Sequence, residues 1–181
     1  MPNPKVRKNI MYKVITAGEG GVGKTTLLHK FVEGKFKIDT KMTIGVGFFL
    51  KDITLENGKT YSLQLWDFGG QELFRPFLDS YALGANGAIL MFDLTRMDTL
   101  KRIDEWVDII RKKNPGVPII FVGGKLDLKD KISVDDEYAL EFKEKYNFFD
   151  YVKVSSKTGE NVEYVFTALT KEIVSFMESK K

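Results

Sequence analysis

Apolar and polar positions along this chain follow a pattern whose period changes from one short segment to the next. Residues from about 10 to 17 form an apolar run that predicts a strand, and a helical pattern extends from about Lys24 to Glu33. Two further predicted strands flank Asn57-Gly58, a pair typical of tight hairpins. The start of the chain therefore predicts a strand, a helix and a β-hairpin.

The rest of the chain alternates between predicted strands and helices. Ala88–Phe92 and Pro118–Val122 are continuous apolar runs typical of buried parallel strands, and Tyr151–Val154 is expected to be the last strand. Helical stripes of apolar residues occur at Leu100, Ile103, Val107 and Ile110, at Ala139, Phe142 and Tyr146 after a capping sequence at Ser133–Asp136, and at Val162, Phe166, Leu169, Ile173 and Phe176. This order predicts a doubly wound α/β sheet that binds ligands at the carboxyl ends of its strands.

Length and composition exclude several classes of protein. The 181 residues suit one domain, expected over residues 10–177, between a basic arm at 1–9 and a short tail at 178–181. A net charge of +3 is too weak to indicate nucleic-acid binding. The chain has no cysteine, which excludes disulfides, thiolate metal sites, a cysteine nucleophile and a thioether lipid anchor. We expect a cytoplasmic monomer, whose association with any membrane is peripheral and through partners.

The most specific motif is Gly18-Glu-Gly-Gly-Val-Gly23-Lys24-Thr25, which has the pattern of a phosphate-binding loop. Glycines allow backbone N–H groups to turn inward around phosphate oxygens, and the N-terminus of the following helix adds its dipole. Lys24 supplies a positive charge for the outer phosphates, and the Thr25 hydroxyl can ligate Mg²⁺. The residues expected to bind the phosphates are Gly20, Gly21, Val22, Gly23, Lys24, Thr25 and Thr26.

A second candidate segment, Asp67-Phe-Gly-Gly70, follows the predicted third strand. An acid that ends a strand beside a phosphate loop can hold Mg²⁺ through a water molecule. Gly70 can then offer its backbone N–H to a terminal phosphate, and Gln71 can orient an attacking water. Asp-x-x-Gly is common by chance and Gln71 alone also fits a solvated loop amide, so this interpretation depends on the position after the strand.

Together these residues resemble the Ras-like small GTPases from about Ile10 to Phe176. The similarity is greatest to Rab proteins and is found in the segments Thr43–Phe48, Lys51–Leu55, Ser62–Trp66 and Tyr81–Ala85. Phe68-Gly69 differs, since Rab proteins usually have Thr-Ala there. The resemblance implies a single P-loop NTPase domain with a mostly parallel six-stranded sheet, one antiparallel strand and helices on both faces.

The resemblance also implies roles for individual residues. Thr43 is expected to ligate Mg²⁺ and touch the γ-phosphate, with Thr25 and, through water, Asp67 as further metal ligands. Phe36 is expected to pack across the guanine ring. The other residues expected at the base are Lys125, Asp127, Ser155, Ser156 and Lys157. Asp127 would accept hydrogen bonds from guanine N1–H and the 2-amino group, and the Ser156 N–H would donate to O6.

The implied function is a Mg²⁺-dependent switch that hydrolyses GTP to GDP, slowly without an activating partner, with Gln71, Lys24 and Thr43 as catalytic residues. Effectors, exchange factors and activating proteins are expected to bind through residues 36–48 (the first switch segment) and 69–80 (the second switch segment). Two alternatives stay open: a module that holds guanine nucleotide with negligible hydrolysis, and a P-loop kinase. The sequence places no arginine obviously in the site, and spacing alone does not place the Arg75 side chain.

Two further departures from the family have consequences for binding. Gly124 stands where the family usually has Asn or Thr, a side chain that braces the phosphate loop and contacts the purine. Glycine supplies neither contact, so nucleotide is expected to be held less tightly than in a typical relative, unless a neighbouring side chain or a water fills the gap. The chain also ends without the prenylated cysteines usual in Rab proteins, so no covalent lipid anchor is expected.

Overall fold

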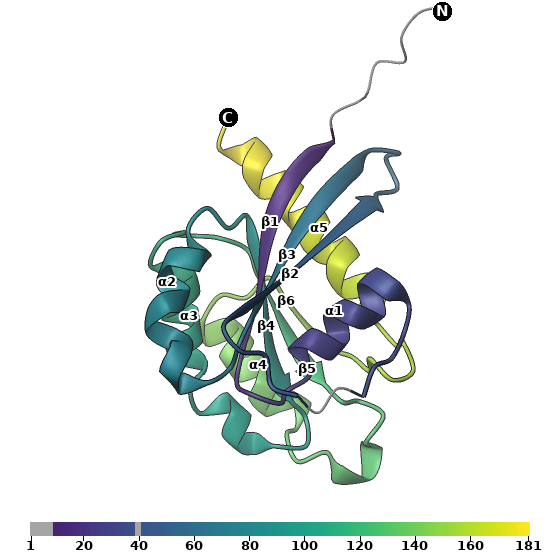
Figure 1. Cartoon of the computed structure of the whole chain (residues 1–181), viewed down its shortest axis with the longest axis vertical. Coiled ribbons are helices and arrows are strands. Elements are labelled where there is room, and N and C mark those ends of the chain that lie inside the picture. The colour runs from purple at the N-terminus through teal and green to yellow at the C-terminus, as the bar shows by residue number, and fades with distance from the viewer. Residues whose placement is uncertain (1–8, 39–40) are drawn as a thin grey trace, which may run out of the picture.

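A twisted sheet of six strands forms the centre of the computed structural model, which describes residues 9–38 and 41–181 (Figure 1). The strands lie in the order β2-β3-β1-β4-β5-β6. Their bounds are β1 Ile10–Ala17, β2 Val46–Thr54, β3 Thr60–Phe68, β4 Gly87–Asp93, β5 Ile119–Gly124 and β6 Asp150–Lys153. β2 pairs antiparallel with β3, and the other neighbours pair in parallel. The mostly parallel sheet with one antiparallel strand is confirmed.

Helices cover both faces of the sheet, as expected (Figure 1). α1 (Lys24–Glu33) and α5 (Val162–Ser179) cover one face, and α2 (Arg75–Ala82), α3 (Ile103–Arg111) and α4 (Asp136–Lys145) cover the other. Successive side chains of a strand point to opposite faces, so Val14 packs with α1 and α5 while its neighbour Ile15 packs with α2 and α3. The continuous apolar runs in β4 and β5 follow from this two-sided burial.

Several element bounds differ from the predicted ones. Met97–Leu100 forms a 3-10 turn, so the helix predicted to include Leu100 begins at Ile103. The turn is closed by Thr99, whose hydroxyl donates to the Arg96 carbonyl at 2.7 Å and accepts from the Asp93 N–H at 3.0 Å. The predicted strands at Pro118–Val122 and Tyr151–Val154 are displaced by one residue at their starts, to the bounds of β5 and β6.

The predicted capping sequence at 133–136 contains the observed cap of α4, while the end of α5 differs from expectation. α4 is capped by Asp135, whose carboxylate accepts from the Tyr138 N–H at 2.7 Å. α5 continues to Ser179, two residues into the segment predicted as a tail. The predicted basic arm lies outside the described residues except for Asn9. Within the described ranges, α5 included, no helix has the length and apolar character needed to cross a membrane.

Candidate active site

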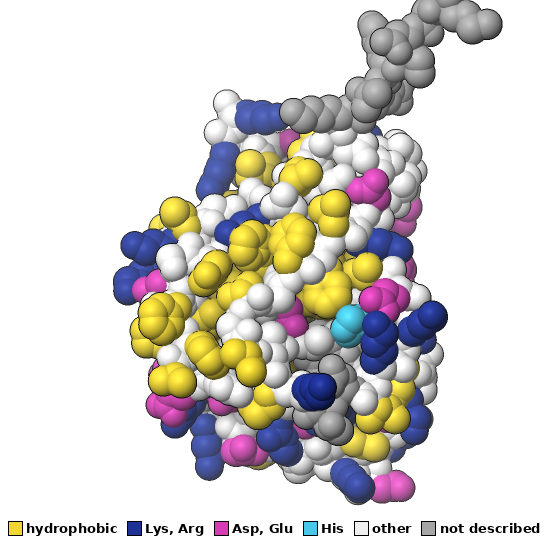
Figure 2. Space-filling model, viewed as in Figure 1, with side chains coloured by type: hydrophobic (Ala, Val, Ile, Leu, Met, Phe, Trp, Pro, Cys, Tyr) yellow, Lys and Arg dark blue, Asp and Glu magenta, His cyan; other side chains and the backbone are white. Residues whose placement is uncertain are grey.

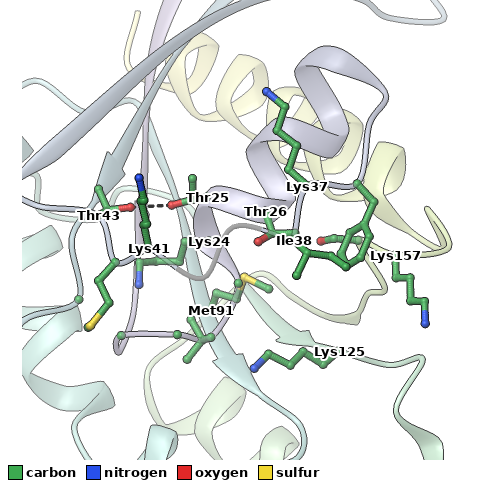
Figure 3. Close-up of a pocket in the computed structure, with 18 of the residues that line it drawn as sticks. Lys24, Thr25, Thr26, Lys37, Ile38, Lys41, Thr43, Met91, Lys125 and Lys157 are labelled. Carbon is green, nitrogen blue, oxygen red and sulfur yellow. Dashed lines mark hydrogen bonds between the residues drawn. The ribbon is translucent and has the colours of Figure 1, made fainter.

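A cavity of about 600 Å³ lies at the carboxyl edge of the sheet, where the loops after β1, β3, β5 and β6 meet the segment between α1 and β2 (Figure 3). The residues that line it are Gly20, Gly21, Val22, Gly23, Lys24, Thr25, Thr26, Phe36, Lys37, Ile38, Lys41, Met42, Thr43, Gly70, Met91, Lys125, Asp127, Leu128, Ser156 and Lys157. Of the predicted site residues, only Asp67, Gln71 and Ser155 do not line it. The fold therefore brings the predicted phosphate-binding and base-binding segments to one place.

The phosphate loop passes very close to β4. Gly18 follows β1 with a φ of 140°, a backbone conformation that residues other than glycine rarely adopt. A β-carbon there would lie 2.1 Å from the carbonyl oxygen of Met91. Glycine at this position therefore lets the chain turn tightly from β1 into the loop that precedes α1.

The Lys24 side chain is buried beneath this loop, with only 5% of its surface exposed. Its ammonium donates to the carbonyl oxygens of Gly18 at 2.8 Å and Glu19 at 2.7 Å. Burial lowers the pKa of Lys24 to about 8, against the attraction of Asp67 and Glu19. A positive charge held in the loop is suited to binding phosphate.

Three oxygen-bearing side chains from different segments converge beside Lys24. The Thr25 hydroxyl donates to Asp67 Oδ2 at 2.5 Å and lies 2.7 Å from the hydroxyl of Thr43 (Figure 3). Thr43 also donates to the same Asp67 oxygen at 3.3 Å. α1, β3 and the first switch segment therefore meet at one carboxylate.

The same group of oxygens fits Mg²⁺. Asp67 Oδ1 is buried and has no hydrogen-bond partner among the residues that the structure describes. Burial raises the pKa of Asp67, against the hydrogen bond from Thr25 and the charge of Lys24. A cation beside this carboxylate would offset its burial, and hydroxyl and carboxylate oxygens are the ligands that Mg²⁺ prefers. Thr25, Thr43 and, through water, Asp67 are the residues that would hold it.

The second switch segment lies directly on the phosphate loop. A β-carbon on Gly70 would lie 2.3 Å from the Gly20 nitrogen, so only glycine allows this approach. The Gly69 N–H donates to the Gly45 carbonyl at 2.8 Å, which joins the second switch segment to the end of the first. Gln71 Nε2 lies 3.7 Å from the sulfur of Met42. Residues 39 and 40 of the first switch segment lie outside the described residues.

The base-binding segments are held together by their own hydrogen bonds. The buried Ser155 hydroxyl donates to Asp127 Oδ1 at 2.7 Å and accepts from the Thr158 N–H at 3.1 Å. Ser155 therefore orients Asp127 from behind, while Ser156 and Lys157 line the cavity itself. Phe36, which is partly exposed, lines the same cavity from the first switch segment.

Asp93, at the end of β4, is a residue that sequence reasoning missed. Its fully buried carboxylate pairs with Lys125 at 2.6 Å and with Arg96 Nε at 3.1 Å. Arg96 Nη2 also donates to the carbonyl oxygen of Gly20 at 3.0 Å. Asp93 thus joins the base-binding segment to the phosphate loop. The sequence signal that could have indicated Asp93 is its position directly after the apolar run Ala88–Phe92, at the carboxyl end of a strand.

Arg75, whose side chain could not be placed from sequence, turns inward at the start of α2. It pairs with Glu19 of the phosphate loop at 2.5 Å and with Glu105 of α3, and its guanidinium stacks 4.8 Å from the ring centre of Trp106. Only 8% of its surface is exposed. These partners fix Arg75 as an anchor of α2 on α3 and the phosphate loop.

The gap expected beside Gly124 is filled. A β-carbon on Gly124 would lie 2.4 Å from the terminal methyl of Met91, which also lines the cavity. The sequence left open whether the space beside Gly124 is empty or is filled by a neighbouring side chain or a water. In the structure the Met91 side chain occupies it.

This fold and cavity define a P-loop nucleotide-binding protein. The sequence profile of the Ras family matches residues 13–175. The Ras-related protein Rab-11A of Dictyostelium discoideum is 36% identical over 168 residues, which cover 92% of this chain and 78% of that protein. RABA4b of Arabidopsis thaliana is 36% identical over 171 residues, which cover 94% of this chain and 75% of that protein. Rab-4B of Rattus norvegicus is 37% identical over 172 residues, which cover 94% of this chain and 80% of that protein.

The chain therefore belongs to the Ras family, as a Rab-like GTPase that hydrolyses GTP to GDP and phosphate. The resemblance found in the sequence is confirmed, and membership of this family excludes the P-loop kinase alternative.

Proposed function

We propose that this protein is a Mg²⁺-dependent switch that cycles between GTP-bound and GDP-bound states. The observation that supports this most is that the Thr25 and Thr43 hydroxyls both lie against the buried carboxylate of Asp67. Thr43 belongs to the first switch segment, so a ligand bound at this point sets the position of that segment. Mg²⁺, when bound, supplies charge neutralisation for the β- and γ-phosphates.

In the proposed reaction, water attacks the γ-phosphorus in line with the bond to the β–γ bridging oxygen. A new P–O bond forms, the bridging bond breaks, and GDP leaves as the proton passes to the released phosphate. Lys24 and the loop N–H groups bind the developing negative charge, and Gly70 offers its N–H to the γ-phosphate. Gln71 orients the water. Since Arg75 is anchored elsewhere, unassisted turnover is expected to be slow, of order 10⁻⁴–10⁻³ s⁻¹, the intrinsic rate of Ras itself.

We propose that the nucleotide is selected through its base by Asp127. Its carboxylate, oriented by Ser155, faces the cavity and accepts from N1–H and the 2-amino group of guanine. Adenine has no matching pair of N–H groups, and an unmatched buried acceptor costs about 1–3 kcal/mol. Phe36 packs across the ring, and Lys125, Ser156 and Lys157 complete the pocket.

We propose that a protein effector that recognises the GTP-bound form binds an apolar patch made of the exposed side chains of Phe48, Leu50, Leu73, Phe77 and Tyr81 around the partly buried Trp66. Figure 2 shows hydrophobic side chains gathered where β2, β3 and α2 lie. Phe48 packs edge-on against Trp66 with ring centres 5.5 Å apart, and Tyr81 lies 6.1 Å from Trp66. The patch joins both switch segments, so the γ-phosphate controls its shape. Exchange factors and activating proteins are proposed to use the same segments.

The proposed setting follows from the same features. A chain without cysteine suits the reducing cytoplasm, and a switch read by proteins reaches a membrane through those partners. We propose that the protein acts as a monomer and binds no nucleic acid.

The direct test of the switch is to denature the purified protein, identify the released nucleotide, and follow GTP turnover with Mg²⁺ and with EDTA. We expect guanine nucleotide, and slow hydrolysis that EDTA abolishes. Gln71→Leu should slow hydrolysis about tenfold or more with nucleotide affinity nearly intact, because Gln71 acts in the transition state. Gln64→Leu is the matched control and should hydrolyse GTP normally. Turnover unchanged by EDTA or by Gln71→Leu would contradict the proposal.

The effector surface is tested by immobilising the protein with GDP or a non-hydrolysable GTP analogue and measuring retention of proteins from a cell extract. We expect proteins retained only by the GTP form, and their loss in Phe77→Ser. Leu140→Ser changes an exposed leucine on α4 and should retain them. Equal retention in both nucleotide states would contradict the assignment of this patch.

A further inference from the structure

Met91 occupies a position between the two halves of the nucleotide site. Its side chain projects from β4 toward the α1 and α5 face, is 1% exposed, and lines the cavity. Its terminal methyl lies 2.4 Å from where a β-carbon of Gly124 would stand, and 3.5 Å from that of Gly23. One flexible side chain therefore spans the space between the base-binding segment and the phosphate loop.

Figure 3 shows Met91 at the centre of the pocket, between Lys24 and Lys125. A β-carbon at Gly124 would also lie 3.1 Å from the Val22 carbonyl, so a larger residue there must displace Met91 and press on the phosphate loop. Residues 91 and 124 are thus complementary in volume, with a long side chain on one strand and none on its neighbour.

In the proposed binding mode Asp127 accepts from the N1 edge of guanine and the Ser156 N–H donates to O6. N7 is the next acceptor along the base from O6, and this binding mode turns it toward the ends of β4 and β5, where Met91 and Gly124 lie. A methionine thioether has no hydrogen to donate. The nearby Lys125 ammonium is already paired with Asp93 at 2.6 Å.

We infer that Met91 is a specificity-determining residue that contacts the N7 edge of the base through a methyl group, so that N7 receives no hydrogen bond. This inference rests on the proposed guanine-nucleotide site and adds a substrate preference to it. The protein accepts guanine nucleotides in which carbon replaces N7, because replacing an unpaired acceptor by C–H costs no hydrogen bond. A thioether is soft and adaptable, which suits it to an edge contact with an aromatic ring.

The test is competition of GDP and 7-deaza-GDP against a ribose-labelled fluorescent GDP, at fixed Mg²⁺, on the full chain. We expect the two dissociation constants to agree within about twofold, whereas a lost hydrogen bond to N7 weakens binding by about 3- to 10-fold. Weaker binding of 7-deaza-GDP by about fivefold or more overturns the inference. Failure of GDP itself to bind overturns the proposed function instead, so the two failures are distinguishable.

Variants separate Met91 from its surroundings. Gly124→Asn combined with Met91→Ala makes room for an amide and supplies an N–H donor, so we expect it to gain a preference for GDP over 7-deaza-GDP of about 3- to 10-fold. In Gly124→Asn alone the new side chain must displace Met91, so this variant should bind GDP more weakly. Met97→Leu changes a partly exposed methionine outside the cavity and should leave both constants unchanged. A double variant that folds and binds GDP without gaining the preference contradicts the inference.

A second measurement does not depend on affinity. With ¹³C-methyl methionine in all six positions, the Met91 methyl signal is assigned by its loss in Met91→Leu. We expect addition of GDP to shift that signal through the ring current of the base, and the Met97 signal to stay in place. A Met91 signal that does not move when GDP saturates the protein contradicts contact with the base.

Discussion

Asp93 lies fully buried at the end of β4, where its carboxylate binds residues that serve both ends of the nucleotide site. One oxygen pairs with Lys125 and Arg96, and the other accepts from the Thr95 N–H at 2.9 Å and its hydroxyl at 2.7 Å. Burial alone would raise the pKa of Asp93, but these bonds, led by that from Lys125, hold its pKa below the ordinary value. The charged form is therefore part of the folded structure.

Asp93→Asn should lower the free energy of unfolding by about 2–4 kcal/mol at pH 7, because Lys125 and Arg96 lose their shared anion. A lowered pKa in the folded state contributes stability above the ordinary aspartate pKa, and this contribution is lost as pH falls through the lowered value. The difference between wild type and variant should therefore be constant above about pH 5 and shrink below about pH 4. Urea unfolding at several pH values measures it.

Asp98→Asn is the matched control for that experiment, since Asp98 is exposed in the turn that follows β4. It should change stability little at any of these pH values. An Asp93→Asn penalty that stays constant down to pH 3 would show that the charge of Asp93 is not what stabilises the fold.

Asp127→Asn should move base preference from guanine toward xanthine. An amide loses the acceptor for the guanine N–H pair and can donate to the 2-oxo group of xanthine, while Oδ1 still accepts from Ser155. Competition binding with GDP and XDP measures the change, and Asp130→Asn, an exposed neighbour, is the control. Tighter binding of XDP in the control as well would show that the preference does not come from Asp127.

At the scale of elements, α2 is attached to the phosphate loop and to α3 through Arg75. Glu19 accepts from Arg75 and also from the indole N–H of Trp106 at 3.0 Å, so one carboxylate of the phosphate loop is shared by α2 and α3. α2 is therefore held away from the cavity, and Gly70, which precedes it, is the residue of the second switch segment that lines the cavity.

Arg75→Ala should lower the free energy of unfolding by about 2–3 kcal/mol, because Glu19 and Glu105 lose a charged, well-buried partner. It should also change the fluorescence of Trp106, against which Arg75 is stacked. Arg102→Ala removes an exposed arginine that pairs with Glu72 and Glu105, and should leave the melting temperature nearly unchanged. Equal effects of the two substitutions on unfolding would contradict the anchoring role of Arg75.

The strands and the phosphate loop could be predicted because their signals are local. Alternating and continuous apolar runs give β1 to β6 within a few residues, and the spacing of glycine, lysine and threonine indicates the loop before α1. The hydrogen bonds from Arg75 and Trp106 to Glu19 could not be predicted, because the bonded residues are 56 and 87 positions apart and meet only when α2 and α3 pack. Met91 was missed for the same reason, since its sequence context is that of a core strand.

At the scale of the whole molecule, the nucleotide site joins segments that are otherwise separate. Thr43 reaches the carboxylate of Asp67, Gly70 lies on Gly20, and the Gly69 N–H bonds to Gly45. Each contact involves a switch segment, while the sheet and α5 are held by an extensive apolar core. A change at the γ-phosphate is therefore expected to move the switch segments and leave the rest in place.

Amide hydrogen exchange with GDP and with a non-hydrolysable GTP analogue, at saturating Mg²⁺, tests the central claim of a nucleotide-controlled switch most directly. Thr43 and Gly70 can contact the γ-phosphate only when it is present. The GTP analogue should therefore slow exchange in the first and second switch segments, with exchange in α5 unchanged. Identical exchange of both switch segments in the two nucleotide states would contradict the account, whatever the rate of hydrolysis.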